Sequence, residues 1–246
     1  MNIGAEWKGG DMMKFRNRGF CVNGAWVAGA VLLAVCVAKA DDLGSSTRNI
    51  TRLDSNLSVT PVMFSFCTPV EIPWWHSSWD VAGIRFCLPY GSCDDFSGLD
   101  VGVVTHADNS CGIQCSAVNI VDGDVPIALT VGGLVNVVEG SYSGLQIGGL
   151  VNVVNNDTSA LQVGGLVNVV DGSFTGLQVG FVNVVQAQAK DAWQIGFWNQ
   201  VEDLDHGVQI GVFNYASDTS LGFQLGVINI IANNDYPCVP IVNCRF

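Results

Sequence analysis

Cysteine and histidine are the residues of this sequence that could most directly do chemistry. The chain has nine cysteines and three histidines. In an oxidising compartment, cysteines close in sequence predict local disulfides, and the candidate pairs are Cys87–Cys93, Cys111–Cys115 and Cys238–Cys244. Cys21 and Cys36 fall in the first 40 residues, and Cys67 completes the set. Seven cysteines therefore follow residue 40, and because seven is odd, at least one thiol stays free or pairs between chains.

The sequence gives little indication of other catalytic or metal-binding chemistry. The three histidines (His76, His106 and His206) are scattered and no Cys-x-x-Cys pair exists, which disfavours a zinc site. Acidic turns such as 203–205 lack the spacing of calcium-binding loops, so we interpret them as solvated turns. No nucleophile elbow, phosphate-binding loop or zinc-binding helix motif occurs. We therefore expect a non-catalytic protein without a cofactor.

The charge distribution along the chain predicts export. The 246 residues carry a formal net charge of −12, yet basic residues at positions 14–18 precede an apolar run over 25–38. The run ends in an Ala-Lys-Ala site, which is the signal-peptide pattern with cleavage before Asp41. Met13 is an alternative start that preserves the same pattern. The acidic remainder would repel phosphate backbones, so we expect no nucleic-acid partner.

A repeat of 15 to 16 residues fills most of the chain and must position any functional group. One phase of the repeat carries glutamine and a second phase carries asparagine. The glutamine phase comprises Gln114, Gln146, Gln162, Gln178, Gln194, Gln209 and Gln224, with Thr130 in the missing place and Asp100 and Arg85 before it. The asparagine phase comprises Asn119, Asn136, Asn152, Asn168, Asn183, Asn199, Asn214 and Asn229. Glycine recurs mostly two residues before and usually two after each glutamine.

The local pattern predicts short β-strands in both phases. Each glutamine and most asparagines lie between two apolar, often β-branched residues, as in Leu145-Gln146-Ile147 and Val151-Asn152-Val153. We interpret this pattern as a strand with two apolar side chains inward and one amide outward. Cys115 holds one of these apolar positions, directly after Gln114, so we expect its side chain to face inward. Polar, glycine-rich stretches such as 139–141 and 155–157 predict turns.

Two all-β architectures fit a strand in every repeat. A parallel β-solenoid with coils of about 15–16 residues would stack identical residues into hydrogen-bonded amide ladders. The alternative is an antiparallel outer-membrane β-barrel, which the terminal Phe246 after alternating apolar residues supports. The spacing from glutamine to asparagine is six residues at Gln146 but five at Gln178. Because this change would invert every later side chain of one continuous strand, it favours a glycine corner and hence the solenoid.

The pattern along the chain predicts its domain organisation. We expect a signal peptide over 1–40, an exposed leader over 41–56 and an N-terminal cap over 57–97. The β repeat domain would cover 98–235, followed by a C-terminal cap strand over 236–246. Proline and tryptophan mark the first cap and Pro237 and Pro240 the second; since proline cannot donate to a ladder, it limits growth at a sheet edge.

The repeat also resembles that of a known family. The stretch Gly-Leu-Gln-Val-Gly-Phe-Val-Asn-Val over 176–184 is similar to the repeats of exported bacterial surface repeat-containing proteins. The segment 80–102 resembles the entry segment of that family, and the ending 239–246 is similar too, so the resemblance covers about residues 60–246. It implies an envelope or surface location and no established enzyme activity. Cys115 departs from the apolar residues usual in the repeats.

Together these features predict a non-catalytic scaffold of the bacterial envelope, in the outer membrane, the periplasm or at the cell surface. Its regular glutamine and asparagine ladders would be presented to an unidentified protein or glycan partner, and association with a membrane is compatible with the composition. The alternative function is that of an outer-membrane barrel or pore. An ice-binding solenoid is a third hypothesis, disfavoured because such a surface needs threonine ladders facing water.

Overall fold

The computed structural model describes residues 59–66, 71–72 and 80–245, and those residues form strands and turns without a helix. The expected signal peptide, the leader and most of the proline- and tryptophan-rich segment lie outside the described residues. The strands are β1 (Val59–Ser65), β2 (Glu71–Ile72), β3 (Asp80–Val121), β4 (Val125–Val138), β5 (Tyr142–Gly148), β6 (Val151–Val154), β7 (Thr158–Gly164), β8 (Val167–Val170), β9 (Phe174–Val179), β10 (Val182–Ile231) and β11 (Cys238–Arg245).

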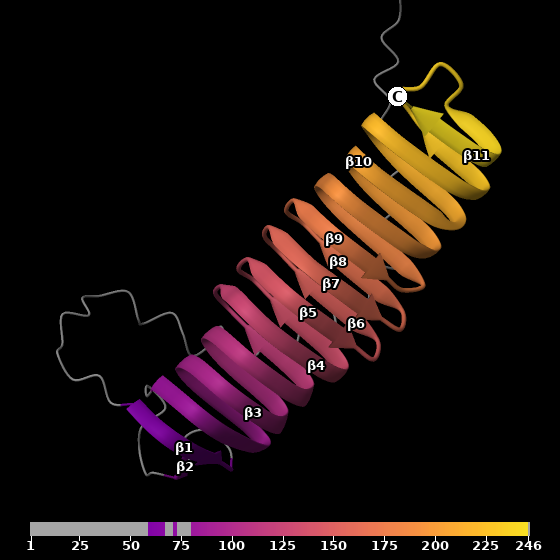
Figure 1. The fold of residues 1–246 in the computed structure, drawn as a ribbon. Coiled ribbons are helices and arrows are strands. Elements are labelled where there is room, and N and C mark those ends of the chain that lie inside the picture. The colour runs from indigo at the N-terminus through magenta and orange to yellow at the C-terminus, as the bar shows by residue number, and fades with distance from the viewer. Residues whose placement is uncertain (1–58, 67–70, 73–79, 246) are drawn as a thin grey trace, which may run out of the picture.

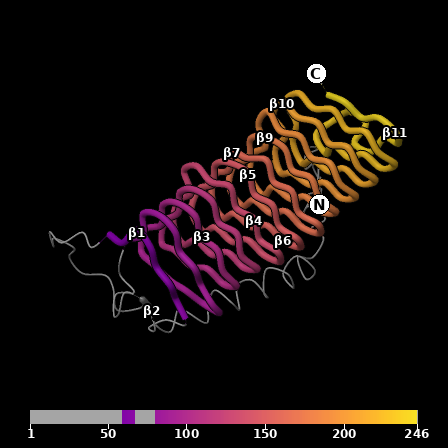
Figure 2. The backbone as a smooth tube through the Cα atoms, turned by 60° about the horizontal axis from the view of Figure 1, so that its bottom comes forward, coloured from indigo at the N-terminus to yellow at the C-terminus, as the bar shows by residue number. Residues whose placement is uncertain are grey.

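The strands stack along one axis as a parallel β-solenoid, which confirms the predicted fold class (Figure 1). Each coil pairs in parallel with the next, and the register places like on like: Gln146 opposite Gln162, and Asn152 opposite Asn168. The antiparallel alternative is wrong for these coils. The tube in Figure 2 shows successive turns of chain lying one over another from β3 to β10.

One coil, residues 142–157, illustrates the path of the chain. Strand β5 carries Gln146, the pair Gly148-Gly149 turns the corner, and β6 carries Asn152 on the opposite side of the coil. A polar turn over 155–157 then leads into β7 of the next coil. The long strands β3 and β10 each run through several such coils.

The orientation of the repeat is the reverse of what we inferred from its pattern. Gln146 and Asn152 are 0% exposed and point into the coil, whereas Ile147 is 36% exposed on the outer surface. Cys115 is likewise exposed rather than inward. An apolar-polar-apolar triplet alternates equally well with either face inward, so the triplet alone does not tell which face is the interior.

Small residues in the phase of the amides explain why the amides lie inside. Gly148 has the same inward direction as Gln146, and a Cβ added at Gly148 would lie 2.4 Å from Oδ1 of Asn152. Glycine at this position therefore leaves the interior volume that the asparagine amide occupies. The interior becomes apolar only toward the polar turns, where a column of small and aliphatic side chains is buried: Val121, Val138, Val154, Val170, Val185, Val201, Ala216 and Ile231.

Strands of different direction lie at the two ends of the solenoid. Strand β1 adds a parallel strand to the first coil of β3, and β2 pairs with β1 in antiparallel fashion. Strand β3 runs without interruption through the expected boundary at residues 97 and 98. At the other end, β11 turns back and pairs antiparallel with the last coil of β10, where Gln224 lies opposite Asn243.

Candidate functional site

The asparagines form a continuous hydrogen-bonded ladder inside the coils. From Asn119 to Asn214, each Nδ2 donates to Oδ1 of the asparagine in the next coil, over 2.7–2.9 Å. From Asn136 to Asn214, the same Nδ2 atom also donates to a backbone carbonyl of the next coil, as Asn152 does to Val163 at 3.1 Å. Because amides buried without partners would be costly, these paired contacts allow a polar interior.

The glutamines form a second ladder with the opposite direction. Nε2 of Gln162 donates to Oε1 of Gln146 at 2.9 Å, toward the N-terminal end, and the pattern continues to Gln224. Asparagine donors point toward the C-terminal end, so the dipoles of the two ladders oppose each other. Every member of both predicted ladders is buried, and none of these amides is therefore presented to a partner.

The glutamine ladder is interrupted near the N-terminal end. Both amide atoms of Gln114 and Nε2 of Gln146 have no hydrogen-bond partner, and between them lies Thr130, whose side chain is too short to bridge the gap. The Tyr142 hydroxyl lies beside Thr130 Oγ1 and donates to the Leu145 carbonyl at 2.7 Å. Tyr142 thus occupies space that the missing amide would take.

A buried ion pair replaces the ladder in the first coils. Arg85 and Asp100 are both 0% exposed, and Arg85 donates through Nε and Nη2 to the two carboxylate oxygens at 3.1 and 2.5 Å. Arg85 Nη1 also donates to the His106 carbonyl at 2.9 Å, and the guanidinium lies 5.3 Å from the centroid of the Phe96 ring. The bidentate geometry and the extra donor contact compensate for burying two charges.

The cysteines do not form the predicted disulfides within the described residues. Cys111 and Cys115 lie four residues apart along β3, and Cys238 and Cys244 lie six residues apart along β11. At about 3.3 Å per residue, their Cα atoms are separated by more than the ~7 Å limit for a disulfide. All four thiols are exposed.

Cys87 and Cys93 differ from the other cysteines because both are buried beside the ion pair. Both occur as free thiols, and Cys87 Sγ lies 3.7 Å from Oδ1 of Asp100. Burial, as the largest cause, raises the pKa of each thiol to about 12. These groups are therefore protonated near neutral pH, which makes them poor nucleophiles.

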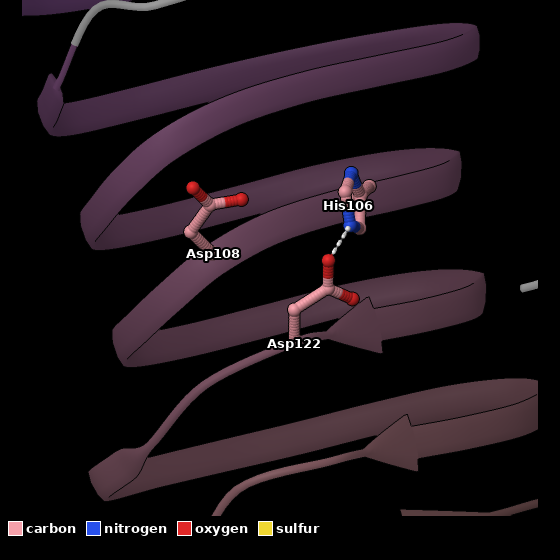
Figure 3. A group of neighbouring side chains, drawn as sticks. All are labelled: His106, Asp108 and Asp122. Carbon is pink, nitrogen blue, oxygen red and sulfur yellow. Dashed lines mark ion pairs between the residues drawn. The ribbon is translucent and has the colours of Figure 1, made fainter. Parts of the chain in front are cut away.

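His106, Asp108 and Asp122 bring three groups that could hold a metal ion within 4.8 Å of one another (Figure 3). His106 Nε2 lies 3.1 Å from Oδ2 of Asp122, and the His106 ring is only 13% exposed. Its Nδ1 lies 3.1 Å from Oγ of Ser92. One imidazole and two carboxylates suit first-row divalent ions, but the His106–Asp122 contact is already an ion pair when the ring is protonated. Sequence reasoning missed this group because Asp122 lies one coil after His106 and Asp108 and meets them only through the stacking of the coils.

The largest continuous functional candidate is the outer surface of the glutamine strands, which we call the apolar face. From Thr130 to Gln224, the residues on both sides of each member of the glutamine phase point outward and are apolar. The apolar face consists of Leu129, Val131, Leu145, Ile147, Leu161, Val163, Leu177, Val179, Trp193, Ile195, Val208, Ile210, Phe223 and Leu225. Within it, Trp193 is 51% exposed. A monomer in water rarely exposes so long a run of apolar side chains, which indicates an interaction surface.

A second apolar surface adjoins the first at the glycine corner, and we call it the ridge. After each corner glycine or glycine pair, one large side chain projects outward. The exposed ridge residues are Leu134, Leu150, Leu166, Phe181, Phe197 and Val227. Stacking continues among their rings, since Phe181 and Phe197 lie 4.8 Å apart with an interplanar angle of 6°. The apolar surface therefore covers one side of the coil and the adjoining corner.

The comparisons with known proteins return no relative. No protein-family model, curated protein or solved structure matches this chain. Nowhere in residues 59–66, 71–72 and 80–245 does the chain form a helix long and apolar enough to cross a membrane. The class defined by the fold and the site is a repeat scaffold, a parallel β-solenoid with stacked asparagine and glutamine ladders in its interior.

Proposed function

We propose that this chain is an exported, non-catalytic structural scaffold of the bacterial envelope, acting through the apolar outside of its solenoid. The amides that would otherwise bind ligands or assist catalysis hold one coil to the next, as the Asn152–Asn168 bond does. This use of the polar side chains is the observation that carries the proposal. It replaces the expectation that the amides are displayed to a partner.

The rigidity expected of such a rod supports a structural role. Each coil is joined to the next by parallel backbone pairing and by amide ladders, so the solenoid is stabilised by contacts between neighbours. A role in holding or covering an envelope surface needs only a stable rod with one adhesive side.

Export is supported by the basic residues at 14–18, the apolar run over 25–38 and the Ala-Lys-Ala site before Asp41. The resemblance to exported surface repeat-containing proteins supports the same location. The partner would be an envelope component rather than a nucleic acid, because the polar turns are acidic and would repel phosphates.

Fractionation of cells that produce the full chain tests this proposal. We expect the protein in the envelope fraction, with a new N-terminus at Asp41 found by N-terminal sequencing. A matched variant, Ala38→Arg with Ala40→Arg, should block the cleavage because the processing site needs small residues. An intact N-terminus on a cytoplasmic wild-type protein would contradict the proposal.

A further inference from the structure

We propose that the partner of this scaffold is the surface of a lipid bilayer, into which the ridge and the apolar face insert from one side. The inference deepens the proposed envelope function and rests on it. Its foundation is an inside-out distribution of polarity: fully buried amides such as Gln162 and exposed apolar side chains such as Leu161 alternate along one strand.

Charge is segregated across the section of the solenoid. From Val125 to Ile231, neither the apolar face, nor the ridge, nor the glycine corners between them include a charged residue. Charged side chains of this stretch lie in or beside the opposite turns, at Glu139, Asp157, Asp171, Lys190, Asp191, Glu202, Asp203, Asp205 and Asp218. One edge of the rod is thus acidic and solvated, while the opposite edge is apolar throughout its length.

An apolar solvent would leave the backbone and interior amides of this side paired. Backbone groups at the ridge pair between coils, as the Leu166 N–H does with the Leu150 carbonyl at 3.0 Å. The amides inside donate to one another, as Gln178 does to Gln162. A structure enters hydrocarbon only when such groups are satisfied internally, and the glutamine column meets that condition from Gln162 to Gln209.

The shape of the apolar surface favours lipid over a second copy of the chain. Ridge residues such as Phe181 project from a convex corner, whereas Leu177 and Val179 lie on the adjoining side. A second rod packed on the flat apolar face would leave the ridge in water, but lipid chains can cover both. A strand of about six residues is ~20 Å long. Half of that length, ~10 Å, matches the depth to which interfacial segments insert.

A shallow groove near the C-terminal end adds a place for a lipid chain. It has a volume of about 720 Å³ and lies along the glycine corner, between Ile210 on the apolar face and Val227 on the ridge. Pro240 and Ile241 of β11 form its end wall. Its lining side chains are all apolar, so the chemistry that fits is an aliphatic chain.

The acidic turns further specify the kind of membrane. With Lys190 as the only Lys or Arg from Val125 to Ile231, the rod has few groups to attract anionic headgroups. We therefore expect binding to neutral phosphatidylcholine vesicles that does not increase when anionic phosphatidylglycerol is added. Basic interfacial segments behave in the opposite way.

Vesicle flotation of the purified exported protein tests the inference. The ridge variant Leu150→Gln, Leu166→Gln, Phe181→Gln should reduce binding to phosphatidylcholine vesicles at least about tenfold, because three apolar side chains no longer enter lipid. The matched control Ser141→Gln, Asn155→Gln, Ser173→Gln places the same amides in the exposed polar turns and should bind like wild type. Circular dichroism verifies that each variant folds.

Trp193 provides a readout that is independent of any other membrane-binding segment. Phosphatidylcholine brominated on its acyl chains should quench the wild-type fluorescence more than that of Trp193→Phe, since Trp193 is exposed on the apolar face. Equal quenching, unchanged flotation of the ridge variant, or a dimer that the ridge variant dissociates in the absence of lipid would overturn the inference. An exported protein with one of these results would refute lipid insertion while leaving the envelope scaffold intact.

Discussion

The hydroxyl of Tyr142 lies 3.3 Å from Oγ1 of Thr130, at the point where threonine interrupts the glutamine column. One coil further on, Thr158 takes the place of Tyr142 and Gln146 takes the place of Thr130. The large Tyr142 beside the short Thr130 is thus replaced by the short Thr158 beside the long Gln146. The pair shows that these two inward positions, on neighbouring coils, share one interior volume.

This shared volume predicts strong coupling between the two positions. Thr130→Gln alone should lower the free energy of unfolding by about 1–3 kcal/mol, because the longer side chain collides with Tyr142. The double variant Thr130→Gln, Tyr142→Thr should recover stability, since Gln146 Nε2 and Gln114 gain an amide partner. Urea denaturation of both single variants and the double variant gives the coupling energy. Additive effects would show that the volume is not shared.

The asparagine ladder should be costly to interrupt at its centre. Asn168 accepts from Asn152 and donates to Asn183 Oδ1 at 2.8 Å and the Val179 carbonyl at 3.0 Å. Asn168→Ala should therefore lower the free energy of unfolding by about 3–5 kcal/mol, measured by urea denaturation.

A conservative variant and a surface control make this ladder test interpretable. Asn168→Asp keeps the shape but loses both amide donors, so it should be unstable at neutral pH and partly recover in acid, where a protonated carboxyl donates again. Ser159→Ala, at an exposed position, should change stability by less than about 0.5 kcal/mol. A central ladder variant as stable as this control would contradict the structural role of the amides.

The fold could be predicted from the sequence because one regular feature determines it. Residues such as Gln146 and Gln162 recur with nearly constant spacing, and identical residues form ladders only between parallel strands in register. The change of spacing at Gly180 could also be interpreted, since a corner tolerates one residue more or less. These arguments depend on the period of the repeat and not on which face is buried.

The direction of the side chains could not be derived from the same alternation. Leu161-Gln162-Val163 is equally consistent with either face inside, and the general preference for apolar interiors pointed the wrong way. The position of glycine carries the missing signal, because Gly164 shares the inward phase of Gln162 and leaves room for an amide. The predictions of the Cys111–Cys115 and Cys238–Cys244 disulfides failed for a related reason: residues four or six positions apart along an extended strand lie too far from each other to be bridged.

Gly144 should be far less replaceable than its neighbour at the outer corner, Gly133. Gly144 has a φ of 132°, and a Cβ there would lie 2.1 Å from the Ala128 carbonyl oxygen. Gly144→Ala should lower the free energy of unfolding by at least about 2 kcal/mol. At Gly133 the nearest atom to a new Cβ is the Ala117 Cα at 3.6 Å, so Gly133→Ala should be nearly neutral. Equal denaturation midpoints for the two variants would contradict this packing.

The two buried thiols should make the fold sensitive to alkaline pH. Burial raises the pKa of Cys87 and Cys93 from 9.0 to about 12. Above pH 9 the unfolded chain releases these protons while the folded chain keeps them, so stability falls as pH rises toward 12 and is fully present below 9. Each thiol contributes up to about 1.4 kcal/mol per pH unit in this window. Urea denaturation at pH 8, 9 and 10 measures the slope.

A chemical probe separates these thiols from other groups that titrate in alkali. In the native protein, iodoacetamide at pH 8 should modify the exposed Cys111, Cys115, Cys238 and Cys244. Cys87 and Cys93 should react only after unfolding, because they are both buried and protonated. Cys93→Ala should in addition reduce the alkaline loss of stability per pH unit, whereas Cys111→Ala serves as the exposed control. Rapid native labelling of Cys87 and Cys93, or identical pH slopes for the two variants, would show that burial does not govern their protonation.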